Sequence, residues 1–235
     1  MAPTVISRAD PSVVWCETFV SLQGEGPFTG QRAAFVRFAH CNLNCVYCDT
    51  EYAWNWAKHH REQETQRGPA SEIASWFRAQ NVDLIVVTGG EPMLQQDALA
   101  FLAEACAPAR IQVETNGTRT PTAAVASAVT LFVVSPKLVN SGVSAQRRIV
   151  PAALHALAAT RKAAWKFVVT AVADLAEVDA LAREYALAPV WIMPEGTSTR
   201  DVLRRARLLA DPVVQRGWNL SLRTHILLWG ERRGR

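Results

Sequence analysis

Three cysteines lie close together in the sequence, in a pattern that suits a single metal centre. They are Cys41, Cys45 and Cys48, spaced as C-x3-C-x2-C, and they are three of the five cysteines in the chain. A 4Fe-4S cluster that only carries electrons needs a cysteine on each of its four irons. Three close cysteines without an evident fourth therefore indicate a cluster with one iron left open for a substrate or cofactor.

A structural zinc site is the first alternative for these thiols. Such a site normally has four ligands, often as two C-x2-C halves or as one C-x2-C followed by a histidine pair. Cys16 and Cys106 stand alone, however, and His40, His59 and His60 do not form that histidine pattern. Three structural cysteines that cluster by chance are a second alternative. Cysteine spacing is only a hypothesis until its context supports it.

Glycine-containing and polar motifs accompany the cysteines. In chain order they are SLQGEG at 21–26, CDT at 48–50, TGGEP at 88–92, ETNGT at 114–118, SPK at 135–137 and MPEG at 193–196. In TGGE, the two glycines allow a ligand to approach the backbone closely, and Glu91 can accept a hydrogen bond from an ammonium group. A plain strand-to-helix turn explains the glycines but not the acidic residue beside them.

Residues 17–54, together with TGGEP, resemble the radical S-adenosylmethionine superfamily. The cysteine spacing alone identifies only the superfamily. SLQGEG, CDT, ETNGT and SPK in this order resemble one family within it, the 7-carboxy-7-deazaguanine synthases. The matching segments run from Glu17 to about His225. The resemblance implies a radical S-adenosylmethionine lyase, in which the three cysteines hold one 4Fe-4S cluster and S-adenosylmethionine chelates the open iron.

The implied reaction is a ring contraction in which the cofactors supply the difficult chemistry. By resemblance, S-adenosylmethionine is split into methionine and a 5′-deoxyadenosyl radical, which takes hydrogen from C6 of 6-carboxy-5,6,7,8-tetrahydropterin. Mg2+ then favours the rearrangement, ammonia is lost, and the hydrogen returns to S-adenosylmethionine. The product, 7-carboxy-7-deazaguanine, feeds 7-deazapurine pathways such as queuosine biosynthesis. Another radical enzyme, such as a glycyl-radical activase, is the alternative, because it would share the cluster and TGGEP.

The resemblance also assigns cofactor contacts to matching positions of this sequence. The residues implied to bind S-adenosylmethionine are Tyr47, Asp49, Gly89, Gly90, Glu91, Ser135, Pro136, Lys137, Met193, Pro194 and Glu195. For MPEG a plain turn is an equal alternative, because Pro and Gly are common in turns. Thr50 is the implied Mg2+ ligand, through a hydroxyl that is a weak but acceptable hard ligand.

A heteroaromatic substrate needs directional hydrogen bonds to its ring nitrogens and exocyclic groups. The residues expected to contact the substrate are Leu22, Gln23, Gly24, Glu25, Arg37, Thr88, Glu114 and His225. A guanidinium at Arg37 could grip a carboxylate by two parallel bonds, although a solvated strand arginine is the alternative. By resemblance, Glu114 faces the aminopyrimidine edge of the substrate. Asn116 and Lys166 are further polar residues near strand ends.

Length and composition indicate a soluble globular protein. The chain has 235 residues, of which 49% are hydrophobic and 20% are charged, values that are ordinary for a folded domain. We expect a cytoplasmic enzyme, because there is neither a membrane-length apolar run nor a secretory pattern, and reduced thiols suit that compartment. The net charge is +4, but the basic residues form no dominating tract, so we expect no nucleic-acid partner. A zinc-containing nucleic-acid module is the alternative of a different class.

Short apolar runs alternate with helical patterns, which predicts an α/β fold with a parallel sheet. The expected strands cover 13–20, 33–39, 82–87, 111–114, 131–134, 164–169, 190–193 and 220–223. The expected helices cover 71–80 with Ser71 as N-cap, 94–107, 122–128, 151–161, 174–186 and 198–210. Because ligands of such sheets bind at the carboxyl ends of the strands, the motifs after strands should meet there. The resemblance implies a partial, open parallel (β/α) barrel of roughly six strands.

The whole chain, 1–235, is expected to form one radical S-adenosylmethionine domain. Its first ten or so residues look unstructured. Within the domain we expect an N-terminal substrate-binding strand and loop at 13–40 and a variable, polar insertion at 53–69 with local helix that could cover the site. A basic tail at 230–235 ends the sequence. The resemblance also implies a homodimer and a flavodoxin- or ferredoxin-type electron donor.

Overall fold

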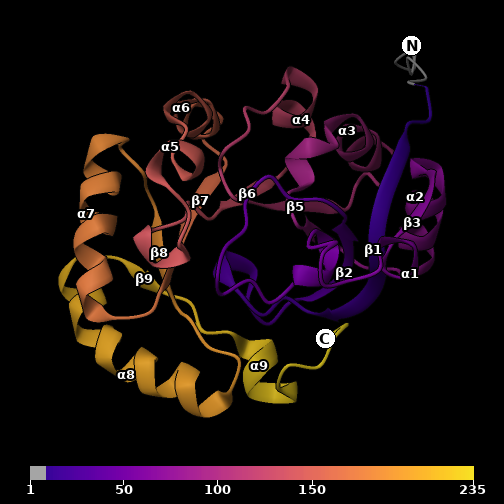
Figure 1. Ribbon diagram of the computed structural model, residues 1–235. Coiled ribbons are helices and arrows are strands. Elements are labelled where there is room, and N and C mark those ends of the chain that lie inside the picture. Colours follow the sequence, from indigo (N-terminus) through magenta and orange to yellow (C-terminus); the bar gives the residue numbers. More distant parts are fainter. Residues whose placement is uncertain (1–8) are drawn as a thin grey trace.

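A mostly parallel sheet of nine strands organises residues 9–235, the part of the chain that the computed structural model describes (Figure 1). The strand order is β3-β1-β2-β4-β5-β6-β7-β8-β9. The strands are β1 (Ser12–Leu22), β2 (Arg32–Phe38), β3 (Gln66–Pro69), β4 (Leu84–Gly89), β5 (Arg110–Thr115), β6 (Leu131–Val134), β7 (Ala163–Val169), β8 (Val190–Pro194) and β9 (Asn219–Leu220). Of the first ten or so residues, which were predicted to be unstructured, 1–8 lie outside the described residues.

Helices connect most of the strands. They are α1 (Arg61–Glu64), α2 (Ala70–Ala79), α3 (Gln96–Ala105), α4 (Ala123–Ala128), α5 (Ala145–Arg148), α6 (Pro151–Ala159), α7 (Leu175–Glu184), α8 (Thr199–Gln215) and α9 (Thr224–Trp229). Figure 1 shows the larger helices on the outer side of the curved sheet, while the loop after β2 lies on its inner side. Within residues 9–235, none of the helices has the length and apolar character needed to span a bilayer.

The open parallel sheet predicted from the sequence is confirmed. Every neighbouring pair from β2 to β9 is parallel, whereas β1 runs antiparallel to both β2 and β3. Because β3 and β9 stand at opposite ends of the strand order, the sheet does not close. The expected core of roughly six parallel strands is extended by β9, a strand of two residues.

Burial of the parallel strands explains their unbroken apolar character. In β4 and β7 nearly every residue is buried, because helices cover one face and the motif loops fill the other. The main core includes Phe38, Phe77, Phe132 and Trp165, all at most 2% exposed. The inward-facing residues of α2 belong to this core, as expected for an amphipathic helix on a sheet.

Two predicted element boundaries are wrong. Ser71 is not the N-cap of its helix, because α2 starts at Ala70 directly after β3, which pairs with β1 and was not predicted. Asp10 instead accepts from the Ser71 backbone N–H at 3.0 Å. The last strand ends at Leu220 rather than at 223, because Arg223 is already the N-cap of α9 and the Ser221 hydroxyl accepts a hydrogen bond from the N–H of Gly26 at 2.7 Å. The remaining predicted strands and helices are present with shifted ends.

The polar segment at 53–69 contains the expected local helix, α1. Its end forms the edge strand β3 rather than a loop. Trp54, at the start of the segment, lies beside the cysteine loop and donates its Nε1–H to the sulfur of Cys48 at 3.2 Å. Short helices α5 and α9 were not predicted, because neither is long enough to show a helical period in the sequence.

Candidate functional site

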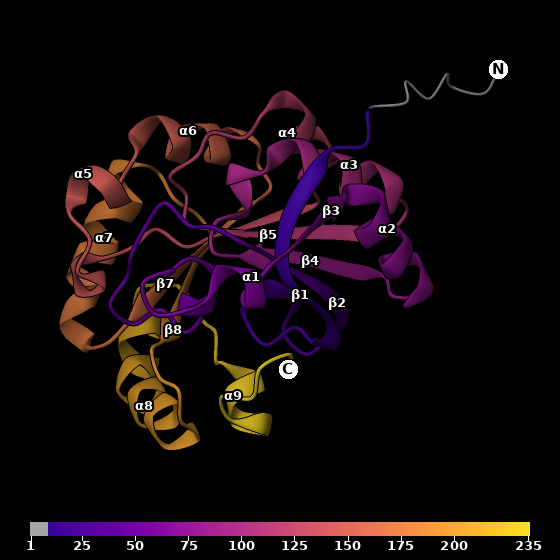
Figure 2. The same cartoon turned by 45° about the vertical axis from the view of Figure 1, so that its right-hand side comes forward.

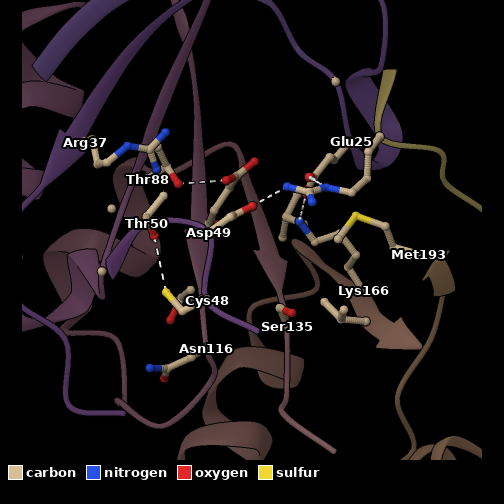
Figure 3. A pocket seen from close by; sticks show the side chains of 18 of the residues that line it. Glu25, Arg37, Cys48, Asp49, Thr50, Thr88, Asn116, Ser135, Lys166 and Met193 are labelled. Carbon is tan, nitrogen blue, oxygen red and sulfur yellow. Dashed lines mark hydrogen bonds and ion pairs between the residues drawn. The ribbon is translucent and has the colours of Figure 1, made fainter. Parts of the chain in front are cut away.

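The sequence motifs meet in one cavity of about 230 Å³ at the carboxyl ends of the parallel strands. Of the predicted site residues, the structure brings the following to its wall: Leu22, Gln23, Gly24, Glu25, Arg37, Cys41, Cys45, Tyr47, Cys48, Asp49, Thr50, Thr88, Gly89, Gly90, Glu114, Ser135, Lys137, Met193, Glu195 and His225. Glu91, Pro136 and Pro194 do not line it. Figure 3 shows side chains from several strands converging on this space.

All three cysteines of the loop after β2 line the cavity. The Leu43 N–H donates to the Cys41 sulfur at 3.4 Å, and Trp54 donates to Cys48 as described. Burial raises the pKa of Cys41 to about 12 and also raises that of Cys45. Thiolates here therefore need a compensating cation, which a metal centre provides. Among the His, Cys, Asp and Glu side chains of residues 9–235, no three lie close enough together to hold a single metal ion.

The cavity also has unpartnered polar groups that fit a polar cofactor beside the cysteines. The buried Tyr47 hydroxyl has no hydrogen-bond partner among the described residues, and burial raises the pKa of this phenol. Lys137 donates to the Ser135 hydroxyl at 3.1 Å and has no carboxylate partner within residues 9–235. A ligand with a carboxylate and hydroxyl groups would satisfy both side chains.

The glycines of TGGEP are required by a close contact between two backbones. A Cβ atom on Gly89, where φ is +148°, would lie 2.2 Å from the carbonyl oxygen of Phe38. A Cβ atom on Gly90 would lie 2.2 Å from the carbonyl oxygen of His40. The end of β2 and the start of the cysteine loop therefore occupy the space of these side chains, and close approach to a ligand stays a prediction for both glycines, which line the cavity.

Glu91 lies behind the cavity wall, and its expected hydrogen bond to a bound ammonium group stays a prediction. Its side chain is fully buried and accepts from the Met93 N–H at 3.0 Å, the Thr115 hydroxyl at 2.8 Å and the Asn116 N–H at 2.7 Å. Burial raises the pKa of this carboxyl. Glu91 therefore ties β4 to β5 and positions the loops that line the cavity.

Glu114 also presents a carboxylate to the cavity. One of its oxygens accepts from Gln23 at 3.1 Å and from Gln112 at 3.3 Å, and the other accepts from the Thr88 hydroxyl at 2.8 Å. These partners are neutral, so the negative charge remains available to a ligand. Carboxylate, amide and hydroxyl groups at this point can accept from and donate to the edge of a heteroaromatic ring.

Arg37 is held in place by a second carboxylate. Its Nε–H donates to Glu17 at 2.8 Å, and the same Glu17 oxygen accepts from the Tyr52 hydroxyl at 2.8 Å. The pKa of Arg37 is raised, because Tyr52 and Glu17 outweigh the effect of burial. Its terminal nitrogens have no hydrogen-bond partner within the described part of the chain, and Arg37 lines the cavity. The side chain is only 16% exposed, so the solvated alternative does not apply.

A chain of charged groups crosses the cavity floor. Glu25 pairs with both Lys166 and Arg223, and Arg223 also pairs with Asp49. Burial alone would raise the pKa of Glu25, but the two cations hold it well below its usual range. Figure 3 shows Lys166 directed toward Glu25. His225 lies 3.9 Å from Glu25, and burial lowers its pKa.

Arg223 is the main site residue that sequence reasoning missed. The apolar residues around it suggested a strand, whereas it occupies the N-cap position of α9. Trp54 and Arg235 also line the cavity. No local signal marks Arg223, because its contacts are with segments far away in the chain, whereas Trp54 contacts Cys48, only six residues before it.

Comparison with known proteins agrees with this geometry. The family model described as Radical SAM superfamily matches residues 35–179. A 7-carboxy-7-deazaguanine synthase of Pyrobaculum aerophilum is 36% identical over 231 residues, which are 97% of this chain and 99% of the relative. One from Halobacterium salinarum is 34% identical and covers 94% of this chain and 92% of its own length.

Two solved structures share the fold. QueE from Escherichia coli has a TM-score of 0.70 and 25% identity, covering 91% of this chain and 95% of its own. SuiB from Streptococcus suis, solved with bound S-adenosylmethionine, has a TM-score of 0.54 and 17% identity, covering 80% of this chain and 51% of its own. At that identity SuiB shows a common fold alone.

Proposed function

The chain belongs to the radical S-adenosylmethionine superfamily and, within it, to the 7-carboxy-7-deazaguanine synthases, and on this premise we propose that it catalyses the synthase reaction. The substrate is 6-carboxy-5,6,7,8-tetrahydropterin, the product is 7-carboxy-7-deazaguanine, and ammonia is released. The observation that carries the proposal is that one cavity combines the three loop cysteines with the Glu114, Gln23 and Thr88 group.

The cluster and its cofactor belong at the cysteine end of the cavity. Cys41, Cys45 and Cys48 would hold the 4Fe-4S cluster, and Lys137 and Tyr47 would contact S-adenosylmethionine. When bound, this pair of cofactors supplies hydrogen-atom abstraction from an unactivated carbon. The residues of the chain bind and orient both partners and keep water away from them, because the wall between β2 and β8 encloses the space.

Recognition of the pterin would fall to the opposite end. Glu114 can accept one hydrogen bond from the amino group of the aminopyrimidine edge, through the acceptor site that its three internal donors leave free. Gln23 and Thr88 hold that carboxylate in place. The free terminal nitrogens of Arg37 suit the substrate carboxylate, because a guanidinium matches a carboxylate in a bidentate pair. The two contacts would fix the ring with its saturated carbon toward the cofactor end.

Mg2+ would bind between the two ends. Thr50 and Asp49 both line the cavity, so hard oxygen donors are present there. A single hydroxyl is a weak ligand, and Mg2+ usually keeps several waters and substrate oxygens in its octahedral shell. The ion would therefore bind together with the substrate, and Thr50 would fix its position.

The surrounding biology follows from the same proposal. The product would enter 7-deazapurine pathways such as queuosine biosynthesis. The enzyme would act in the cytoplasm as a homodimer, with a flavodoxin- or ferredoxin-type protein as electron donor and without a nucleic-acid partner.

An anaerobic turnover assay tests this function. The cluster is reconstituted, dithionite, S-adenosylmethionine, Mg2+ and the pterin are added, and the products are separated and identified by mass spectrometry. We expect 7-carboxy-7-deazaguanine from the wild-type protein and none from Cys45→Ala. Cleavage of S-adenosylmethionine with an untouched pterin would instead favour another radical enzyme, and a colourless protein without iron would contradict the cluster itself.

A further inference from the structure

Arg223 makes three polar contacts through one buried guanidinium. Its Nε–H donates to Glu25 at 3.2 Å, its Nη1 donates to the carbonyl oxygen of Gly196 at 2.7 Å, and its Nη2 donates to Asp49. The side chain is 8% exposed. The planar fork of an arginine can hold three acceptors in fixed directions, which the single ammonium of a lysine cannot reproduce.

These three acceptors belong to three separate motifs. Glu25 lies in SLQGEG between β1 and β2, Asp49 follows the last cysteine of the loop, and Gly196 ends MPEG after β8. Asp49 stands at the cofactor end of the cavity, whereas Glu25 lies in the segment proposed to contact the substrate. One side chain therefore connects the two ends.

The backbone around Arg223 is itself fixed to the Glu25 loop. The Thr224 N–H donates to the Gly24 carbonyl at 2.9 Å, and the Gly26 N–H donates to the Ser221 hydroxyl at 2.7 Å. These bonds form without the Arg223 side chain. The guanidinium is therefore not what attaches this segment to the SLQGEG loop.

Neutralising the charge of Glu25 does not explain Arg223 either. Glu25 already has Lys166, whose ammonium pairs with its other carboxylate oxygen. Asp49, in contrast, has no hydrogen-bond or ion-pair partner other than Arg223 among residues 9–235. The contact to Asp49 is what Arg223 adds, and the contacts to Glu25 and Gly196 hold the guanidinium in place for it.

We propose that Arg223 is a positioning residue that fixes the Asp49 carboxylate relative to Glu25, and thereby sets the spacing between the cofactor end and the substrate end of the cavity. The identity of the two ligands rests on the proposed function, whereas the link between the segments rests on the contacts alone. Without Arg223, Glu25 keeps Lys166 and the backbone bonds of its loop, but Asp49 loses its anchor. Replacing Arg223 should therefore loosen the segment around Asp49 more than the segment around Glu25.

Hydrogen exchange of the cluster-loaded protein tests the asymmetry without any turnover. The variants are Arg223→Gln, Arg223→Lys and the control Arg216→Gln, which removes an arginine that pairs with Asp179 at 2.9 Å away from the cavity. Loss of a hydrogen bond to a charged group should speed exchange in residues 48–52 by about tenfold. We expect exchange in residues 22–26 to stay close to that of wild type, and the control to change neither segment.

Turnover provides the second readout, the amount of 5′-deoxyadenosine released per deazaguanine formed. A misplaced cofactor end should raise this ratio several-fold in both Arg223 variants, with a smaller change in the KM for the pterin. A merely structural role would lower the amount of active enzyme and leave the ratio unchanged.

The possible outcomes distinguish the positioning role of Arg223 from the proposed enzymatic function. Equal loosening of both segments, or a wild-type ratio in Arg223→Gln, would overturn the positioning role. If Arg223→Gln does not fold, Arg223→Lys decides, because a lysine variant that behaves as wild type shows that charge alone is sufficient. If the wild-type enzyme forms no deazaguanine, the proposed function fails while the exchange data still decide the role of Arg223.

Discussion

Replacing Glu114 by glutamine removes one charge from the substrate end of the cavity with little change in shape. In the wild-type structure, one carboxylate oxygen accepts from two amide groups and the other accepts from the Thr88 hydroxyl. A glutamine can place its oxygen toward Gln23 and Gln112 and its NH2 toward Thr88, whose hydroxyl then accepts instead of donating. The internal hydrogen bonds therefore survive, and we expect the melting temperature to stay near that of wild type.

Substrate recognition, in contrast, should be weakened in Glu114→Gln. The carboxylate is proposed to accept one hydrogen bond from the aminopyrimidine edge, and a hydrogen bond to a charged group contributes about 1.5–3 kcal/mol. Loss of this contribution in the transition state corresponds to a decrease in kcat/KM of roughly 10- to 150-fold. Steady-state kinetics under anaerobic conditions, with the pterin as the varied substrate, measures the decrease in kcat/KM. The control is Asp179→Asn, which removes a partly exposed carboxylate outside the cavity. A kcat/KM within threefold of wild type, or a loss that parallels a drop in melting temperature, would refute this role for Glu114.

Two further predictions concern the cluster and the acid stability of the fold. Cys45→Ala should abolish the incorporation of iron and sulfide. The control Cys106→Ala removes a similarly buried thiol outside the loop and should retain both. Equal iron content in the two variants would contradict the assignment of Cys45 as a cluster ligand. Asp174 accepts hydrogen bonds from the backbone and hydroxyl of Thr170 and from Asn140, all at 2.8 Å. Burial alone would raise the pKa of Asp174, but these hydrogen bonds lower it. The ionised Asp174 carboxylate therefore stabilises the fold above the pKa of the unfolded state, about 3.9. This stabilisation is lost as the pH falls through the pKa of the folded state. The difference in the free energy of unfolding between wild type and Asp174→Asn should therefore shrink below about pH 4, and a difference that grows on acidification would show that the sign is wrong.

The parallel sheet and most of the cavity wall follow from local patterns in the sequence. Apolar runs such as 131–134 are strands because both of their faces are covered, and SPK follows this run at the carboxyl end where ligands bind. Position after a strand was therefore enough to place Ser135 and Lys137 on the cavity.

The parts that were missed depend on contacts between distant segments. Glu91 carries the motif signal of a ligand contact, but the motif does not indicate that its carboxylate also accepts from Met93, Thr115 and Asn116. Arg223 carries no signal, because its partners Glu25 and Asp49 are 198 and 174 residues away in the chain. The pairing of β3 with β1 likewise joins a polar segment to the sheet edge without an apolar pattern. Local sequence patterns carry no information about such pairings.

The most direct test of the account follows one hydrogen atom. The pterin is labelled with deuterium at C6, and S-adenosylmethionine recovered after anaerobic turnover is analysed by mass spectrometry. If the cysteine end and the Glu114 end of one cavity bring the two molecules together, deuterium will appear in the adenosyl group of S-adenosylmethionine. Turnover in which S-adenosylmethionine and 5′-deoxyadenosine both remain free of deuterium would contradict the account.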